Sequence, residues 1–354
     1  MKNKAFVRTV LLLSILLCGV ALAAVCIGRL STNPLDVLVA IKSKLGVLPV
    51  ANGSLDPQEA AEALQALEEL EAMETVLFKI RIPRVLASIM IGAMLSLSGA
   101  AYQGIFRNPL VSPDILGVSS GACAGAALAI LLGLGMIERQ IFAFLGGILA
   151  VILATTIPRL LKIYSNLVLV LAGIIVGGFL SSLLAIMKFV AEEQTELSAI
   201  VFWQMGSLAS IDLQEVVAIS PVFVFGMILL LGLSWRINIL SFGEVEAKTL
   251  GMNIGQIRGI TIACASLLTA SAVSISGTIG WIGLVIPHLS RLLAGSDHIK
   301  MLPVTMLAGA LFMLIIDTIA RALLTVEIPL SILTGLIGAP FYAWLLYRQR
   351  ANII

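Results

Sequence analysis

"RIPRVLASIMIGAMLSLSGAAYQGIFRNPLVSPDILGVSSGA", residues 81–122, begins with a long apolar run that has arginines near both of its ends. Between Arg84 and Arg107 it contains no charged residue. A helix rises about 1.5 Å per residue, so this run is long enough to cross a hydrocarbon layer of roughly 30 Å. It therefore predicts a membrane-spanning helix, and it raises the question of why arginines stand at both of its ends.

The composition extends this prediction to the whole chain. Of 354 residues, 59% are hydrophobic and 12% are charged, and the mean hydropathy is +1.08. Backbone groups in lipid must be hydrogen-bonded internally, so long apolar runs are expected to be helices. We predict an all-α polytopic membrane protein. The net charge of only +2 gives no basic field of the kind that binds nucleic acid, so no nucleic-acid partner is expected.

Ten apolar segments are candidate spans. The first begins with a basic head that resembles a secretory signal, but its apolar run is too long for a signal core, so we expect an uncleaved anchor. The eighth is interrupted by Gly280, Gly283 and Pro287, and it either crosses the bilayer or only enters it. The segments are 5–28, 84–106, 117–136, 139–158, 166–190, 214–235, 257–276, 278–296, 301–325 and 329–347.

Lysine and arginine are concentrated in every second connection, and the positive-inside trend then predicts that both termini are cytoplasmic. The long first outer segment is the exception to this trend, because it also contains lysines and arginines. We divide the chain into a first transmembrane helix (1–28), an outer segment (29–83) and a transmembrane core (84–354) that together form one domain. Within the outer segment, leucines at helical spacing and five glutamates predict an acidic amphipathic helix over 56–77. Such a helix either lies over the outer face with its charges in water or docks a partner.

The sequence also bears on whether this chain could use ATP. No GxxxxGK[ST] phosphate loop is present, so we expect no ATPase activity of its own. Asp317 is the one carboxylate well inside a span, and Arg321 follows four residues later, which favours a structural ion pair over ion coupling. The scattered cysteines and His288 do not form a metal-ligand pattern. A metal cargo would therefore pass inside a chelator.

One inner connection is unusual. Residues 240–260, "LSFGEVEAKTLGMNIGQIRGI", contain a short mixed-charge helical stretch from Glu244 to Leu250 that Gly251 ends. Such a stretch suits a groove on a soluble partner, although ordinary charged inner loops look similar.

Five ordered motifs carry a resemblance to a known family. Beside the opening stretch they are "VFWQMGSL" (201–208), "GEVEAKTLG" (243–251), "GTIGWIGLVIPHLSRLLAGSDH" (277–298) and "EIPLSILTGLIGAPFYAWLL" (327–346). Their order and spacing resemble the permease subunits of the iron-siderophore, haem and cobalamin ABC importers, the type II importers. The resemblance covers about residues 79–348.

The resemblance implies a ten-helix permease in a bacterial or archaeal cytoplasmic membrane. It implies a second permease copy or a paralogue, two cytoplasmic ATPase subunits that hold ATP and Mg, and an extracytoplasmic substrate-binding protein, with no cofactor in this chain. By the frequency of cargoes in the family, a ferric siderophore is expected first, then haem, then cobalamin, and some relatives carry molybdate or tungstate. A secondary carrier and a non-transporting scaffold are the rival functions.

The resemblance also assigns roles to particular residues. Arg81, Arg84 and Arg321 match arginines that pair with carboxylates of the binding protein, and the alternative is that they reach lipid headgroups. Ser165 and Asn166 match small polar residues that narrow the cytoplasmic gate, and the alternative is that they only begin a helix. The family's ATPase-coupling helix matches Glu244, Glu246, Ala247, Leu250 and Gly251.

Glycines indicate close helix packing. Gly117, Gly121 and Gly125 have GxxxG-type spacing, and Gly92, Gly99 and Gly104 recur along the first core span. Small residues let helix backbones approach closely in a membrane. We expect these positions to be architectural.

Overall fold

The computed structural model describes residues 2–28, 68–163 and 165–350, together with the isolated positions 37, 39, 42, 44 and 65. These residues form helices and connecting turns without a β-strand, so the predicted all-α class is confirmed for the described part of the chain. The acidic helix predicted over 56–77 lies mostly outside the described residues. Its end, 68–75, is helical and leads through a π-helical turn, Val76–Arg81, into the first core helix.

Each of the ten expected segments corresponds to a helix. Among the described residues, seven helices are long and apolar enough to cross a membrane, and three shorter apolar ones accompany them. The ten are α1 (Lys2–Cys26), α4 (Ile82–Phe106), α5 (Val118–Leu131), α6 (Met136–Leu161), α7 (Asn166–Val190), α9 (Leu213–Phe242), α11 (Ile254–Ser276), α12 (Ile282–Ala294), α13 (His298–Ala322) and α14 (Leu330–Arg350).

Several predicted boundaries differ from the observed helices, and two of these differences have a clear physical reason. The span predicted at 214–235 continues as helix to Phe242, because hydropathy marks the part in lipid and not the end of the hydrogen-bonded helix. The ninth span begins at His298 rather than 301, because the Asp297 side chain accepts a hydrogen bond from the Ile299 backbone and caps the helix earlier.

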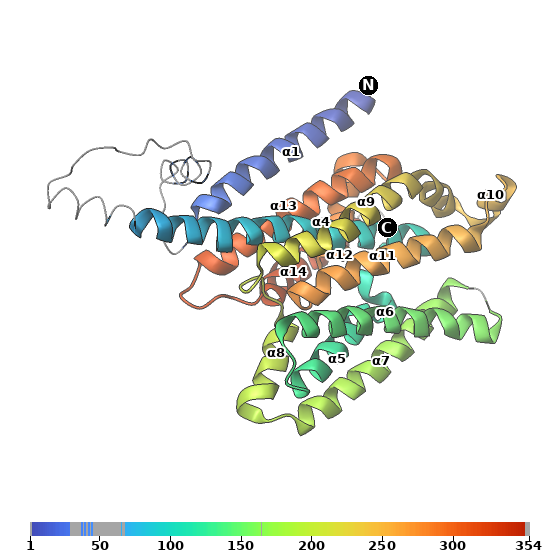
Figure 1. Ribbon diagram of the computed structural model, residues 1–354. Coiled ribbons are helices and arrows are strands. Elements are labelled where there is room, and N and C mark those ends of the chain that lie inside the picture. Colours follow the sequence, from blue (N-terminus) through green and yellow to red (C-terminus); the bar gives the residue numbers. More distant parts are fainter. Residues whose placement is uncertain are drawn as a thin grey trace.

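Helix α4 lies at the centre of the bundle, with α9, α11, α12 and α13 packed around it (Figure 1). Every residue from Ile91 to Phe106 is buried. The glycines of α4 allow this burial, because they let the neighbouring helices approach closely. A β-carbon at Gly92 would overlap the backbone of Gly309 in α13, and one at Gly99 would overlap the backbone of Gly283 in α12. The predicted packing role of these glycines is confirmed.

A second group of helices lies on one side of α11. Helices α5, α6 and α7 and the short α8 (Ser198–Met205) pack together there, below α11 in Figure 1. Gly121 and Gly125 of α5 lie against the backbone of α6 at Gly146 and Phe142. This group contacts the central helices mainly through α6 and α11.

Helix α12 is too short to cross a bilayer. Its 13 residues extend over about 20 Å. The chain before it is not helical. There the Thr278 hydroxyl donates a 2.5 Å hydrogen bond to the Gln204 carbonyl. A β-carbon at Gly277 would overlap the Trp203 carbonyl. Two motifs that are distant in sequence, 201–208 and 277–298, are joined at this point.

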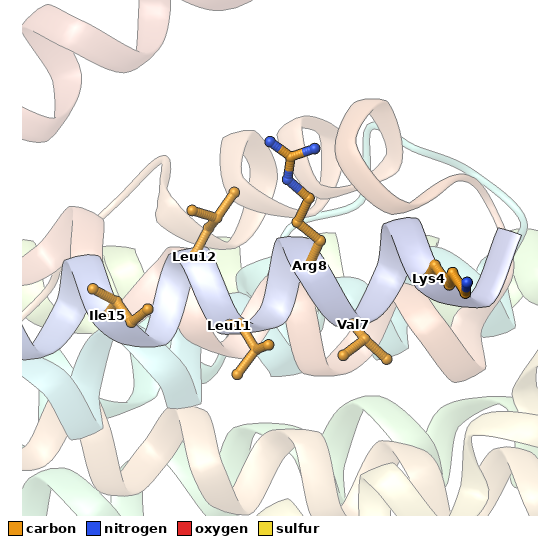
Figure 2. A pocket seen from close by; sticks show the side chains of 6 residues that line it. All are labelled: Lys4, Val7, Arg8, Leu11, Leu12 and Ile15. Atoms are coloured by element: carbon orange, nitrogen blue, oxygen red, sulfur yellow. The ribbon is translucent and has the colours of Figure 1, made fainter. Parts of the chain in front are cut away.

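Helix α1 lies at the edge of the bundle. Its second half packs on α4 and α13 through Ala24, Val85 and Leu314, while its first half points away from the other helices (Figure 1). A hollow there is lined by side chains of α1 alone, which Figure 2 shows, with Leu11, Leu12 and Ile15 exposed on the same helix as Lys4 and Arg8. A hollow with a single wall is a lipid-facing surface rather than a binding site.

The bundle has two ends, which we call the Arg84 end and the α10 end. The Arg84 end holds the beginnings of α4, α6 and α9 and the last turn of α13, and the α10 end holds the short helix α10 (Glu244–Thr249) and the beginnings of α7, α11 and α13.

The packing at Gly99 gives a direct test. Gly99→Ala should destabilise the protein by about 1–3 kcal/mol, because the added methyl forces α4 and α12 apart. The measurement is thermal unfolding of the purified permease. Gly232→Ala is the matched control, since a β-carbon at Gly232 meets no atom within 4 Å. Equal melting temperatures for the two variants would contradict the packing account.

Candidate functional site

Arg84 is the centre of a buried ionic cluster. Its Nε donates to Asp317 Oδ1 at 2.8 Å and to Oδ2 at 3.1 Å, and its Nη1 donates to Glu327 Oε1 at 2.8 Å. Asp317 is fully buried, whereas the Glu327 side chain is 28% exposed. The cluster therefore joins α4, α13 and the turn after α13 at one end of the bundle.

The other two arginines of this end hold the end of α1. Arg81 Nη1 donates to the carbonyls of Val25 and Cys26 at 2.8 and 3.0 Å. Arg321 donates to the Ala24 carbonyl, and its Nε lies 3.9 Å from Asp317 Oδ2. These carbonyls belong to the last turn of α1, where no backbone N–H within the helix can reach them. The guanidinium groups thus act as a cap for α1.

This arrangement changes the interpretation of the outer arginines. Arg81, Arg84 and Arg321 are only 3%, 4% and 7% exposed, and each ends on acceptors of the same chain. The alternative in which they reach lipid headgroups is wrong for this conformation. The predicted Asp317–Arg321 pair is present, but Arg84 is the nearer partner of Asp317. Docking of a binding protein on these arginines stays a prediction.

Because the cluster is buried, each of its charged side chains depends on its partner. A charge in a membrane interior is expensive unless it is paired, so Asp317 depends on Arg84 and Arg84 depends on Asp317. The hydrogen bonds are well formed, which limits the loss on taking both charges out of water.

The predicted coupling residues lie at the opposite end. Helix α10 runs from Glu244 to Thr249, and Gly251 follows it with a φ of +72°, the left-handed conformation that favours glycine. This confirms the predicted local structure. Val245 and Leu250 are 72% and 62% exposed, whereas Ala247 is buried against the bundle. An isolated helix of this size with two exposed apolar side chains is suited to contact another protein.

Glu244 connects α10 to α11. Arg258 Nη2 donates to Glu244 Oε1 at 2.6 Å. This hydrogen bond from Arg258 lowers the pKa of Glu244. Glu244 is therefore ionised at neutral pH and fixes the start of α10 to the first turns of α11. A role in ATPase coupling stays a prediction for Glu244, Glu246, Ala247, Leu250 and Gly251.

The predicted gate residues both have structural contacts. Ser165 Oγ accepts from the Val168 backbone at 3.2 Å and so caps α7. Asn166 Nδ2 donates to the last carbonyls of α4, Ile105 and Phe106, at 3.4 and 3.5 Å. Helix capping accounts for these contacts, and a gate role stays a prediction.

Sequence reasoning missed a polar cavity at the α10 end. A space of about 500 Å³ is lined by residues of the end of α4, the RNPL turn and α12, among them Gln103, Arg107, His288 and Arg291. Arg291 Nη2 lies 2.5 Å from Gln103 Oε1. The signal for it in the sequence is the presence of His288 and Arg291 inside the apolar segment 278–296.

The ionic cluster predicts strong coupling between two positions. Arg84→Gln should destabilise the protein by about 3–5 kcal/mol, because it leaves Asp317 buried without its partner. Adding Asp317→Asn should recover part of this loss, since the unpaired charge is then gone. Thermal unfolding of the two single variants and the double variant measures the interaction. Additive losses would contradict the buried pair.

Comparisons with known proteins agree with this geometry. The FecCD transport family model matches residues 15–348. The chain is 43% identical over 277 residues to the molybdate import system permease protein MolB of Haemophilus influenzae, covering 78% of this chain and 82% of the relative. It is 42% identical over 280 residues to a protein of Helicobacter pylori named as a probable iron chelatin transport system permease, covering 78% and 84%.

Two further likenesses extend over almost the whole chain. It is 36% identical over 339 residues to the cobalamin import system permease protein BtuC of Halobacterium salinarum, which covers 95% of this chain and 91% of the relative. A solved structure described as an inward-facing metal-chelate type ABC transporter superposes with a TM-score of 0.81 at 38% identity, covering 96% of this chain and 99% of the other. The chain therefore belongs to the FecCD transport family and is the permease subunit of a FecCD-type ABC importer.

Proposed function

We propose that this permease moves a metal chelate, a ferric siderophore before haem or cobalamin, from an extracytoplasmic binding protein into the cytoplasm. Two ATPase subunits drive the movement, and a second permease copy or a paralogue completes the pathway. The observation that carries the proposal is α10, which presents Val245 and Leu250 at one end of a membrane-embedded bundle. A stand-alone carrier has no need of such a projection.

The α10 end is the cytoplasmic end in this proposal, and both termini lie on that side. Basic residues support this orientation, because Lys and Arg are enriched in short cytoplasmic connections. Those near the α10 end include Arg107, Arg159, Lys162, Arg236, Lys248, Arg258, Arg291 and Lys300. The Arg84 end then faces the binding protein.

Helix α10 has the features that a coupling element needs. The exposed Leu250 inserts as an apolar contact into the ATPase, and Gly251 provides the tight exit from the helix. Movement of α10 passes to α11 through the Glu244–Arg258 ion pair and through the buried Ala247. Glu246 lies on the exposed side, where it meets the ATPase surface.

Ser165 and Asn166 stand at the same end, at the start of α7. Asn166 already contacts the end of α4, so a shift of α7 against α4 would move both residues together. In the proposed assembly they narrow the cytoplasmic mouth.

Docking at the Arg84 end proceeds by exchange of a carboxylate. Glu327 is the exposed member of the ionic cluster, and it occupies Arg84 Nη1 while the buried Asp317 occupies Nε. A carboxylate of the binding protein takes the place of Glu327 without uncovering Asp317. Arg81 and Arg321 contribute to the positive potential of this end.

Names of the relatives support two cargo classes. Relatives named for iron chelatin, hemin and cobalamin favour a metal chelate. The 43% identity to a molybdate permease favours molybdate as the second candidate.

Reconstituted transport tests the function. Proteoliposomes with the permease, its ATPases and a loaded binding protein should accumulate cargo only with ATP. Leu250→Asp should lower uptake about tenfold, because a carboxylate cannot be desolvated in the ATPase groove. Leu132→Asp, at an exposed leucine of the opposite end, is the control. Accumulation driven by an ion gradient without ATPase would instead establish a secondary carrier.

Carboxylate exchange makes a separate prediction. Glu327→Gln should tighten binding of the binding protein by roughly three- to tenfold, because it frees Arg84 Nη1 from an ionic competitor. Surface-immobilised permease and soluble binding protein give the affinity. Glu193→Gln removes an exposed carboxylate outside the cluster and should have no effect. An unchanged affinity for Glu327→Gln would exclude the exchange.

A further inference from the structure

A groove of about 840 Å³ is lined by α6, α9 and α11 and reaches the beginning of α7 at the α10 end of the bundle. We call it the α6–α11 groove. Its walls are mostly apolar and include Ile148 and Ile152 of α6, Phe225 and Leu229 of α9, and Leu267 of α11. None of the contacts described above accounts for it.

The position of the groove matches one leaflet of a bilayer. Its α6 wall begins at Ile148, near the middle of Met136–Leu161, and ends at Arg159, close to the last residue. This is a rise of roughly 16 Å, about half of a 30 Å hydrocarbon layer. The groove therefore extends from the bilayer midplane to the membrane surface at the α10 end.

The mouth of the groove is cationic. Arg159, Lys248 and Arg258 line it, together with the single carboxylate of Glu244. Glu244 is already engaged by Arg258, and within the described residues neither Arg159 nor Lys248 forms an ion pair. The Nε of Arg258 is buried and makes no hydrogen bond in the described part of the chain. An unpartnered buried donor beside two free cations favours an anionic ligand at this mouth.

Glycines keep the groove open. Gly255 and Gly259 of α11 line it, and a β-carbon at Gly259 would meet no atom within 4 Å. Larger side chains at these helical positions would occupy the groove.

We propose that an anionic phospholipid of the leaflet at the α10 end occupies the α6–α11 groove, with an acyl chain along the apolar walls and its phosphate at Arg159, Lys248 and Arg258. The apolar walls fit the acyl chain, and the cationic mouth fits the phosphate. Anionic lipid is also attracted to basic residues at the membrane surface. The inference does not depend on the cargo of the permease. Because Glu244 and Lys248 belong to α10, the bound phosphate would lie against the proposed coupling helix.

Native mass spectrometry tests whether the α6–α11 groove binds anionic phospholipid. The full-length permease is released from membranes that contain equal amounts of phosphatidylglycerol and phosphatidylcholine. We expect phosphatidylglycerol to be retained preferentially. Arg159→Gln combined with Lys248→Gln should lower the ratio of retained phosphatidylglycerol to phosphatidylcholine at least fivefold, and Gly259→Leu should lower the retention of both lipids. Arg236→Gln and Gly232→Leu, exposed positions outside the groove, are the matched controls.

Several results would overturn the proposal. They are no preference in the unaltered protein, an unchanged lipid ratio in the double charge variant, or the same loss in the Arg236→Gln control. Lipid-free permease dimers would assign the groove to a second copy and would equally overturn it. Arg159 and Lys248 are exposed side chains, so the charge variant decides the question even if Gly259→Leu fails to fold.

Discussion

One guanidinium held between two carboxylates organises the Arg84 end of this permease. Arg84 begins the central helix α4, and its partners Asp317 and Glu327 belong to α13 and the turn that follows. Because a lone charge at this depth is expensive, the two helices are fixed at this end. Along the rest of their length, contact is set by small residues such as Gly92 and Gly309, whose backbones touch. Ionic pairing and close packing together make α4 the helix on which its neighbours are assembled.

The two ends of the bundle differ in how they treat charge. At the Arg84 end the arginines are buried and bonded within the chain. Glu327 is therefore the member of the ionic cluster that reaches the surface there. At the α10 end charges remain exposed around α10, and the Glu244–Arg258 pair connects that helix to α11. In the proposed orientation, the firmly bonded Arg84 end receives the cargo and the α10 end, with its exposed charges, meets the ATPases. The distribution of charge in this chain is consistent with that division of roles.

Helix positions, close-packed glycines and the end of α10 at Gly251 could be predicted from the sequence, because each depends on local hydropathy, spacing or backbone conformation. The span predicted at 166–190 is Asn166–Val190 in the structure. The Arg84–Asp317 contact could not be predicted, since its partners are 233 residues apart in sequence. Local spacing pointed only to Arg321, four residues from Asp317. The α6–α11 groove was missed because it arises from the way two groups of helices meet.

In the free permease the arginines of the Arg84 end bond to acceptors of the same chain. Arginine-selective labelling with phenylglyoxal, followed by mass spectrometry of the protein in nanodiscs, tests this most directly. Arg84 and Arg321 should label far more slowly than the exposed Arg236. Labelling of Arg84 and Arg321 as fast as that of Arg236 would contradict the account, because it would show that these side chains are free at the surface.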